Sequence, residues 1–388
     1  MDFWTILTYT DLFIFILIAL TVLYLGVFAF TSMFARNNET PKAKNQNRFI
    51  ILIPSYKNGK SVEMTVYSIL GQTYPQRLFD VTVIADHEDE ITMFHLAQQP
   101  VTLLTPTYGK STRTKSLQLA INNLPQFKIY DVVIILDAGD VVEPEFLEQM
   151  NDAYESAGTK AIQAHKVSFN RDTVSARLSA IFEEINNSIF RRGHITVGLS
   201  AAMSSSGMVF NFEWFKQQIL AAKINWADKE LEALLLRHHI YVDYFDNIMV
   251  YGEKARQAEE FNRQHRNWII TQWHAILRNL RYLPQAIIQK HYDLIDKLFQ
   301  WMLLPRIVMM IIILLMCVIT PFIYFTMAIK WWALFAIVLF VFAMATPNYL
   351  VDEKWDSTFF KIPIVLMSSI LHKFKIGRKV IDIANLKH

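Results

Sequence analysis

The chain has 388 residues, of which 53% are hydrophobic, and its formal net charge is only +3. So small a charge gives no reason to expect a nucleic-acid partner. Because Cys317 is the single cysteine, the composition excludes a disulfide within the chain and a zinc site built from cysteines.

Three long runs without a charged residue cover residues 12–35, 307–329 and 331–350. About 20 helical residues cross the hydrocarbon core of a bilayer, so each run is predicted to be a transmembrane helix. The first run lacks a basic segment before it and a small-residue cleavage site after it, which favours a retained anchor over a cleaved signal peptide. We expect no acidic residue within these spans, which argues against a transporter. A fourth run, residues 362–371, is too short to span and contains Pro363, so it is interpreted as an interfacial or re-entrant helix.

Basic residues predict the orientation of these spans. The segments "ARNNETPKAKNQNR" after the first run and "HKFKIGRKVIDIANLKH" at the end of the sequence are rich in Lys and Arg. Such segments favour the cytoplasmic side and contact anionic lipid headgroups. We therefore expect a multi-pass protein of the cell (inner) membrane, with residues 36–306 in the cytoplasm and membrane lipids as partners.

The segment after the first span predicts an α/β domain. The apolar runs "FIILI", "FDVTVIAD" and "YDVVIILD" are typical of buried strands. Helical spacing separates them in "VEMTVYSILGQ" and "SLQLAINNL". Strands that alternate with helices indicate right-handed βαβ units and a mostly parallel, Rossmann-like sheet.

Two of these strands end in an acid, Asp86 and Asp137, and Asp140 follows closely in "ILDAGD". Ligands of open α/β sheets bind beyond the carboxyl ends of the strands, so these acids are predicted to meet at one edge. A single strand-terminal Asp more often caps the following turn or helix, and this alternative stays open. A cluster of carboxylates also suits Mg²⁺ or Mn²⁺, which complete their coordination with substrate phosphates.

Farther along, "RNWIITQWHAILRNLRYL" has an apolar helical face with Ile269, Trp273, Ile276, Leu277 and Leu280, and His274, Arg278 and Arg281 lie opposite. Arginine on one side and Trp and Leu on the other are typical of a helix lying in the membrane interface. Packing of the apolar face against the α/β domain is the alternative.

The order "FIILIP…VIAD…ILDAGD…SGMVF…WADKEL…QHRNW" resembles the membrane-bound family 2 glycosyltransferases, a group that includes cellulose, hyaluronan and poly-N-acetylglucosamine synthases and ceramide glucosyltransferase. The resemblance covers roughly residues 49–285 and implies a GT-A fold. It divides the chain into a transmembrane anchor (1–36), a linker (37–48), a GT-A domain (49–265), interfacial amphipathic helices (266–300), two transmembrane helices (301–350), and an interfacial helix with a basic tail (351–388).

The resemblance also implies roles for individual residues. Asp86 would contact the uracil of a UDP-linked donor, near Arg113 and Lys115. Asp137 and Asp140 would hold the diphosphate and its Mg²⁺ or Mn²⁺, and Ser206 and Gly207 would line the donor and acceptor sugars. Asp228 matches the general base. Within "QHRNW", Gln264 and Trp268 match the ends of a motif that grips the acceptor and the diphosphate, and His265 and Arg266 lie between them.

Four departures from the family pattern stand out. Gly139 occupies the position of the second acid of Asp-x-Asp, Ala227 replaces the Glu before the base, and Asn267 replaces the Arg of the last motif. The opening Pro-x-x-Asn-Glu is here "PSYKN".

Three hypotheses remain. The first is a metal-assisted inverting enzyme that transfers sugar from a nucleotide-sugar to a lipid or growing glycan, with Asp228 taking the acceptor proton. For Asp228, capping of the following helix is a compatible alternative. The second is a degenerate scaffold subunit of a polysaccharide synthase complex. The third is an unrelated membrane protein. Three spans are too few for a closed polymer channel, so we expect a short transfer, a lipid acceptor, or a homo-oligomer or partner synthase subunit.

Overall fold

The computed structural model describes residues 3–35, 40–107, 112–222, 228–253 and 258–350. Within these ranges, Phe3, Asp228 and residues 258–268 are described by their backbone alone. The predicted interfacial helix at 362–371 and the basic tail lie outside the described residues.

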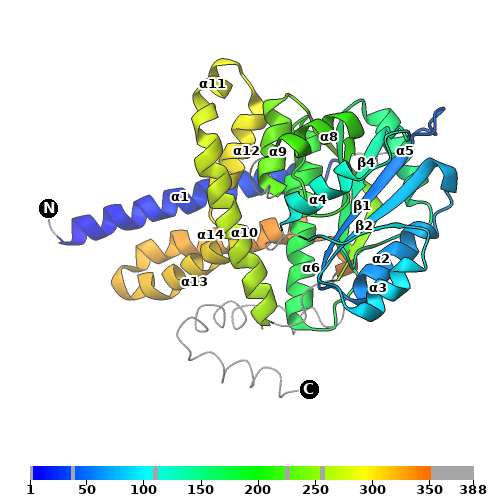
Figure 1. Ribbon diagram of the computed structural model, residues 1–388. Coiled ribbons are helices and arrows are strands. Elements are labelled where there is room, and N and C mark those ends of the chain that lie inside the picture. Colours follow the sequence, from blue (N-terminus) through cyan, green and yellow to red (C-terminus); the bar gives the residue numbers. More distant parts are fainter. Residues whose placement is uncertain (1–2, 36–39, 108–111, 223–227, 254–257, 351–388) are drawn as a thin grey trace.

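An eight-stranded mixed sheet forms the centre of the α/β domain (Figure 1). Its strands follow the order β3-β2-β1-β4-β7-β6-β8-β5. Strands β1, β2, β3 and β4 are mutually parallel, whereas β7 is antiparallel to both of its neighbours. The three predicted strands are β1, β2 and β4, so the mostly parallel α/β prediction is confirmed. The strand bounds are β1 Phe49–Tyr56, β2 Phe79–Asp86, β3 Thr102–Leu104, β4 Val132–Ile135, β5 Val141–Val142, β6 Ala161–Ser168, β7 Met208–Asn211 and β8 Val242–Gly252.

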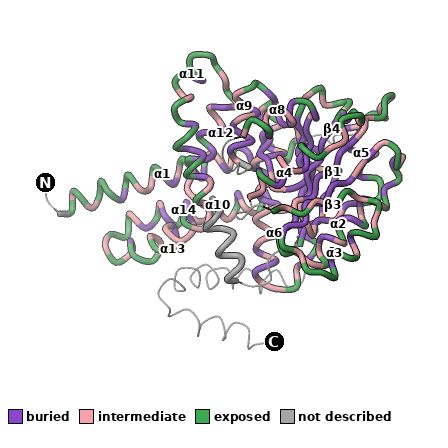
Figure 2. Tube along the Cα trace, in the orientation of Figure 1, coloured by how far each residue is buried: buried purple, intermediate pink, exposed green. Residues whose placement is uncertain are grey.

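Alternating side chains of β1 explain why helices cover both faces of the sheet. Ile51 and Ile53 point into one apolar core with helices α2, α3 and α5, and Ile50 and Leu52 point into a second core with α4, α8 and α9. A strand that is apolar at every position must be buried on both faces, which produces a three-layer domain. Figure 2 shows the buried residues concentrated along the strands. These helices are α2 Lys60–Leu70, α3 Glu90–Ala97, α4 Arg113–Asn122, α5 Phe146–Ala157, α8 Phe212–Ala221 and α9 Asp228–Arg237, and a short 3-10 turn, η1 Gln76–Leu78, precedes β2.

Within the described ranges, three helices are long and apolar enough to cross a membrane: α1 Phe3–Ser32, α13 Arg306–Ile323 and α14 Phe325–Ala345. The number of these helices matches the number of spans expected from the sequence. The predicted boundary between the last two spans is wrong. The two C-terminal helices separate at Tyr324, not at Lys330, so Lys330 lies inside α14.

An ion pair explains why a charged residue is tolerated inside α14. Lys330 pairs with Asp11 of α1, and the indole Nε1 of Trp331 donates to Asp11 Oδ1 at 2.8 Å. The expectation that the spans hold no acid was therefore wrong, because an acid and a base on different helices satisfy each other there.

Close packing joins α1 to the α/β domain. A Cβ on Gly193 of α7 would lie 2.2 Å from the carbonyl oxygen of Phe28 in α1, so only glycine allows this approach. Tyr24 of α1 donates to Asp296 Oδ1 at 2.8 Å and lies 3.0 Å from His194 Nε2. The anchor is thus part of the folded unit. The connecting elements are α6 Val174–Asn186, the π-helical turn η2 Asn187–Arg192 and α7 Gly193–Thr196.

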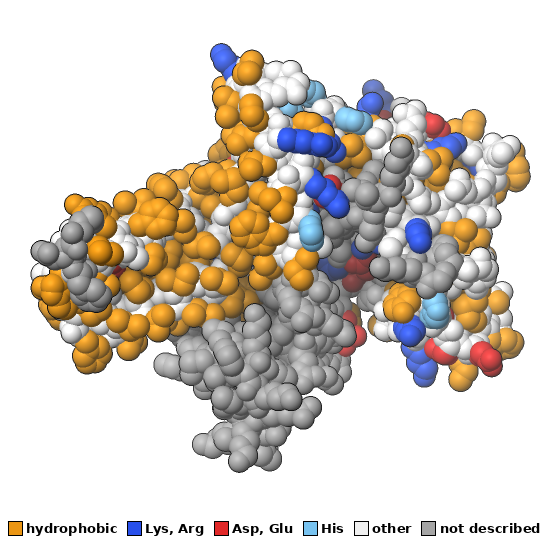
Figure 3. All heavy atoms as spheres, turned by 60° about the vertical axis from the view of Figure 1, so that its left-hand side comes forward, with side chains coloured by type: hydrophobic (Ala, Val, Ile, Leu, Met, Phe, Trp, Pro, Cys, Tyr) orange, Lys and Arg blue, Asp and Glu red, His pale blue; other side chains and the backbone are white. Residues whose placement is uncertain are grey.

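The predicted interfacial segment forms one long helix and three shorter elements, and its apolar face is partly buried and partly exposed. Ile276 is buried with residues of α9 and α12, whereas Trp273, Leu277 and Leu280 are exposed. Part of the face therefore packs on the domain, and the rest continues the hydrophobic surface of the spans (Figure 3). The elements are α10 Ala258–Asn279, η3 Leu280–Tyr282, α11 Leu283–Ile288 and α12 Tyr292–Met302; a last 3-10 turn, η4 Asn348–Leu350, follows α14.

The ion pair between α1 and α14 should stabilise the bundle. We expect Asp11→Ala to lower the free energy of unfolding in detergent by about 3 kcal/mol, because it leaves the Lys330 ammonium unpaired among apolar helices. Adding Lys330→Met should recover most of the loss. The control is Glu148→Ala, which removes an exposed ion pair with Lys42 and should cost at most about 1 kcal/mol. An Asp11→Ala effect no larger than the control would contradict the prediction.

Candidate active site

Asp137 lies at the carboxyl edge of the sheet, two residues beyond β4, and four groups hold it. Arg113 Nη1 lies 2.8 Å from Oδ1. The Ser205 hydroxyl donates to Oδ2 at 2.5 Å, and Lys166 Nζ lies 3.4 Å from the same oxygen. The backbone N–H of Asp137 donates to Ser206 Oγ at 3.0 Å. The predicted residues Asp137, Arg113 and Ser206 are therefore brought together.

Asp140 reaches the same place through a tight turn. Its backbone N–H donates to the carbonyl oxygen of Asp137 at 3.1 Å, and Lys166 Nζ lies 3.0 Å from its Oδ2. Gly139, between the two acids, has φ +97 and donates its N–H to Thr65 Oγ1 at 2.8 Å. Because any residue with a Cβ is strained at this φ, the turn itself requires glycine at the position where the family has an acid.

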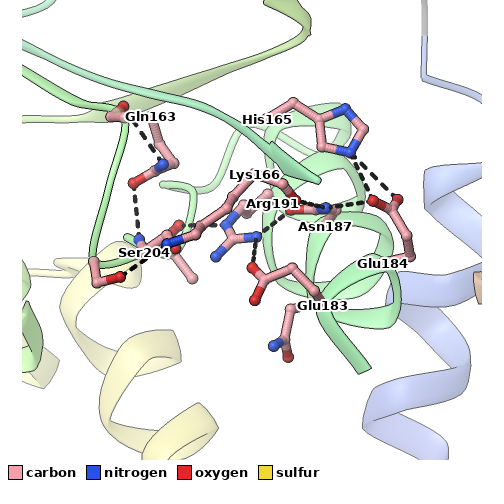
Figure 4. Close-up of polar contacts among 12 residues, drawn as sticks. Gln163, His165, Lys166, Glu183, Glu184, Asn187, Arg191 and Ser204 are labelled. Atoms are coloured by element: carbon pink, nitrogen blue, oxygen red, sulfur yellow. Dashed lines mark hydrogen bonds and ion pairs between the residues drawn. The ribbon is translucent and has the colours of Figure 1, made fainter. Parts of the chain in front are cut away.

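Lys166 of β6 is the central site residue that sequence reasoning missed. The residue was detectable in principle, because "AIQAHKVS" is a fully buried strand in which a charge needs a partner. Asn187 Nδ2 donates to the Lys166 carbonyl oxygen at 3.0 Å, and the neighbouring His165 Nε2 lies 3.0 Å from Glu184 Oε1. Figure 4 shows these contacts joining β6 to α6 and η2.

Gly252, the last residue of β8, makes room for this cluster. A Cβ at this position would lie 2.5 Å from Asp140 Oδ1 and 3.1 Å from Lys166 Cε. The backbone of β8 therefore closes one side of the Asp140–Lys166 pair, and no larger residue fits without moving it.

The two carboxyl groups differ in their proton affinity. Burial raises the pKa of Asp137, but Arg113, Lys166 and the Ser205 hydrogen bond outweigh it, so the net pKa lies below the ordinary value. Burial raises the pKa of Asp140, and the nearby charge of Asp137 raises it further. The Lys166 cation lowers this pKa but offsets only part of the increase, so the net pKa lies above the ordinary value. Lys166 is held as a cation, because the attraction of Asp140 and Asp137 outweighs its burial and raises its pKa.

Asp86 ends β2 at the same edge of the sheet. It is buried, its Oδ1 contacts His87 Nδ1, and its Oδ2 has no hydrogen-bond partner among the described residues. Strand β1 lies between β2 and β4, so Asp86 and Asp137 are about 10 Å apart across two strand spacings. Glu88 organises the adjoining loop by accepting from the backbone N–H groups of Asn58 at 3.0 Å and Gly59 at 2.7 Å.

The other predicted site residues have separate positions. Lys115 is exposed in the first turn of α4. Gly207 has φ +70, and its N–H donates to the Ile135 carbonyl oxygen at 3.0 Å. Asp228 is the first residue of α9, and its side chain lies outside the described part of the chain. The same holds for the side chains in the first half of α10, namely Gln264, His265, Arg266 and Trp268.

The acids do not fit a divalent cation in this arrangement. Oδ2 of Asp137 and Oδ2 of Asp140 both face Lys166 Nζ, which takes the position between them. Gly139 contributes no carboxylate. Across the described ranges, no group of three or more His, Cys, Asp or Glu residues is placed to hold a metal ion.

Restoring the family's second acid should destabilise the fold. We expect Gly139→Asp to lower the free energy of unfolding by about 1–3 kcal/mol, because φ +97 is strained for any side chain. Gly158→Asp is the matched control. Gly158 has φ +62, in the left-handed helical region that Asp tolerates, and a Cβ there meets nothing within 4 Å. Thermal unfolding of both variants measures the two losses of stability. Equal losses in Gly139→Asp and Gly158→Asp would contradict the prediction.

The low pKa of Asp137 predicts a pH-dependent contribution to stability. An acid whose folded-state pKa lies below its ordinary value of 3.8 stabilises the fold above about pH 4, and this stabilisation is lost as pH falls through the folded-state pKa. Asp137→Asn should therefore lower the melting temperature at pH 7, and the difference should shrink below pH 4. Asp140→Asn should cost less at pH 7, because the pKa of Asp140 is raised. An Asp137→Asn effect that does not change with pH would contradict this assignment.

Comparison with known proteins agrees with this geometry. The family model described as glycosyltransferase like family 2 matches residues 46–271, more than half of the chain. No curated protein matches the chain. Among solved structures, the chain is similar to the mannosyltransferase PcManGT from Pyrobaculum calidifontis in complex with GDP-Man and Mn²⁺. The TM-score is 0.55 at 12% identity, covering 92% of this chain and 97% of that chain. It is also similar to S. aureus TarS 1-349 in complex with UDP-GlcNAc, with a TM-score of 0.43 at 12% identity, covering 87% of this chain and 92% of that chain.

At this identity the likeness to PcManGT shows a shared fold alone. The family match, with two strand-terminal acids at one edge of an α/β sheet, supports the assignment of activity. The chain therefore belongs to the glycosyltransferase like family 2, and it is a glycosyltransferase whose α/β domain has the GT-A fold.

Proposed function

We propose that this chain is a membrane-embedded inverting glycosyltransferase that moves a sugar from a UDP-linked donor to a lipid or growing glycan. The single observation that carries the proposal is the Asp137 cluster at the carboxyl edge of β4, one strand away from β2 and its buried, partly unpartnered Asp86. This edge is where open α/β sheets bind nucleotides.

Asp86 supports recognition of a uracil base. Its Oδ2 is buried and accepts no hydrogen bond among the described residues, and such an acceptor is costly unless a ligand donor reaches it. The N3–H group of uracil is a donor that a carboxylate can bind. The spacing of about 10 Å between Asp86 and Asp137 leaves room for a ribose between base and diphosphate.

Arg113 and Lys166 supply the positive charge at the diphosphate end of this site. A guanidinium binds phosphate oxygens in a bidentate manner, and a buried ammonium acts as a point charge. Stabilising the departing diphosphate is the largest electrostatic demand of the transfer. The resemblance to the family implies that Mg²⁺ or Mn²⁺ assists at this step. The structure of PcManGT contains Mn²⁺, which is a property of that protein.

Asp228 is assigned the role of base. In the inverting step, its carboxylate takes the proton of the acceptor hydroxyl, the acceptor oxygen bonds to the anomeric carbon, and the bond from that carbon to the diphosphate breaks. Gln264, His265, Arg266 and Trp268 lie on α10 in the family's acceptor and diphosphate motif, and they would close the site over both substrates.

The acceptor side is assigned to the membrane. Trp273 and Leu277 of α10 and Leu280 of η3 are exposed, and they follow the acceptor motif along the same stretch of chain. The surface of the spans beside this segment is largely hydrophobic (Figure 3). A lipid-linked acceptor could reach the site along this surface. The basic segments at 35–48 and 372–388 support a catalytic domain on the cytoplasmic face.

A second candidate is a scaffold subunit of a synthase complex. The left-handed backbone of Gly139 favours it, because φ +97 strains the side chain that the family's second acid would place in the turn between Asp137 and Asp140. In that case the domain would bind nucleotide weakly or not at all and would act through a partner subunit.

The deciding experiment measures nucleoside diphosphate release by detergent-purified protein, with a panel of UDP- and GDP-sugars and a membrane lipid extract. We expect Asp137→Ala to abolish release. Asp228→Asn should lower kcat by about 10²–10⁴-fold, the range of one general base, with little change in donor affinity.

Asn211→Ala is the control for the capping alternative. Asn211 caps α8 through Trp214 N at 3.1 Å and lies at the opposite edge of the sheet, beside Val132. Loss of the Asn211 cap costs about 1 kcal/mol of stability, whereas Asp228→Asn keeps a residue that caps a helix about as well as Asp. If Asp228→Asn behaves like Asn211→Ala and keeps full turnover, Asp228 is not the base. If no donor is turned over, the scaffold proposal replaces the enzyme proposal.

A further inference from the structure

Lys166 holds the position at which two carboxylates converge. Its ammonium nitrogen lies 3.4 Å from Asp137 Oδ2, 3.0 Å from Asp140 Oδ2 and 3.3 Å from Ser205 Oγ. A divalent cation bound by these two acids would need the same space, since each of its bonds to oxygen is only about 2.0–2.2 Å long.

The lysine is built into this position and is not a flexible surface group. Its side chain is only 10% exposed. Asn187 binds its carbonyl oxygen, and the backbone of Gly252 closes the space beside its Cε. Moving the ammonium away would leave the buried Asp140 carboxylate without its cation, which is costly in a desolvated site.

The charges of the cluster also balance without a metal. Asp137 and Asp140 carry two negative charges, and Arg113 and Lys166 carry two positive charges within ion-pair distance of them. A divalent cation added to this set would face an ammonium across about 3 Å, with no third carboxylate at Gly139 to offset the repulsion.

We propose that the Lys166 ammonium replaces the divalent cation between Asp137 and Asp140, so that the nucleoside diphosphate part of the donor binds independently of metal. The inference rests on the proposed function, because it concerns the same donor site. Lys166 and Arg113 then neutralise the diphosphate, and Asp137 and Asp140 fix the position of Lys166.

The test is calorimetric binding of UDP and of GDP to the detergent-purified full chain, in EDTA and in excess MnCl₂. For the wild type we expect affinity for the preferred nucleotide to agree within about twofold in the two conditions. Lys166→Met keeps the aliphatic stem and removes the charge. Its affinity in EDTA should fall by about tenfold or more, and MnCl₂ should restore part of the loss. Lys166→Arg should retain more affinity in EDTA than Lys166→Met.

Lys160→Met is the matched control, because Lys160 is exposed and immediately precedes β6 at the opposite edge of the sheet. It should bind nucleotide like the wild type in both conditions. A second measurement needs no variant: the electron paramagnetic resonance signal of free Mn²⁺ should not decrease when wild-type protein is added in EDTA-free buffer without nucleotide.

The failures can be told apart. Wild-type affinity that rises tenfold or more with MnCl₂, or Mn²⁺ taken up by the wild type alone, would overturn the role of Lys166 and leave the donor site intact. Nucleotide that binds in neither condition would overturn the proposed function, and this inference with it. A Lys166→Met variant that does not fold leaves the two wild-type measurements to decide.

Discussion

Buried charge at the carboxyl edge of the sheet is the constraint on which the site depends. Asp137 and Asp140 lie in a desolvated turn, and each is stable as an anion only with a cation nearby. Lys166 meets this requirement, and its position in turn limits its surroundings. Gly252 must lack a side chain for the pair to form, and Gly139 must adopt a left-handed backbone for Asp140 to turn inward. Gly139, which looks like a defect of the family motif, is thus part of one self-consistent arrangement.

The same strand connects the site to the membrane helices. Lys166 and His165 of β6 are bound by Asn187 and Glu184, at the junction of α6 and the π-helical turn η2. The next helix, α7, begins at Gly193, against which the backbone of α1 packs directly. Hydrogen bonds and close packing therefore connect the carboxyl edge of the sheet to α1.

Local patterns were sufficient for much of the fold. Continuous apolar runs predicted β1, β2 and β4, because a strand buried on both faces has no polar side, and Asp86 and Asp137 were identified as the acids that end two of these runs. The runs also predicted three spans. The boundary between the last two was wrong, because Lys330 was taken as an end of a helix although Asp11, more than 300 positions away in the sequence, pairs with it inside the bundle. The apolar face of the amphipathic segment in α10 is divided between core and surface. The sequence pattern did not predict this division, because it depends on the packing of Ile276 on α9 and α12, which come from other parts of the chain.

The sequence by itself determined the family, the α/β class, the presence of three helices long and apolar enough to cross a membrane, and the acids Asp86, Asp137 and Asp140 at one edge of the sheet. Each of these depends on residue types that are near one another in the chain or on the order of motifs. Only the tertiary structure decided what the acids bind. Lys166 comes from β6, which is separated from β4 by β7, and Ser205 lies just before β7. A charge pair is set by distance in space and by the exclusion of water, and neither can be deduced from the spacing of residues along one chain.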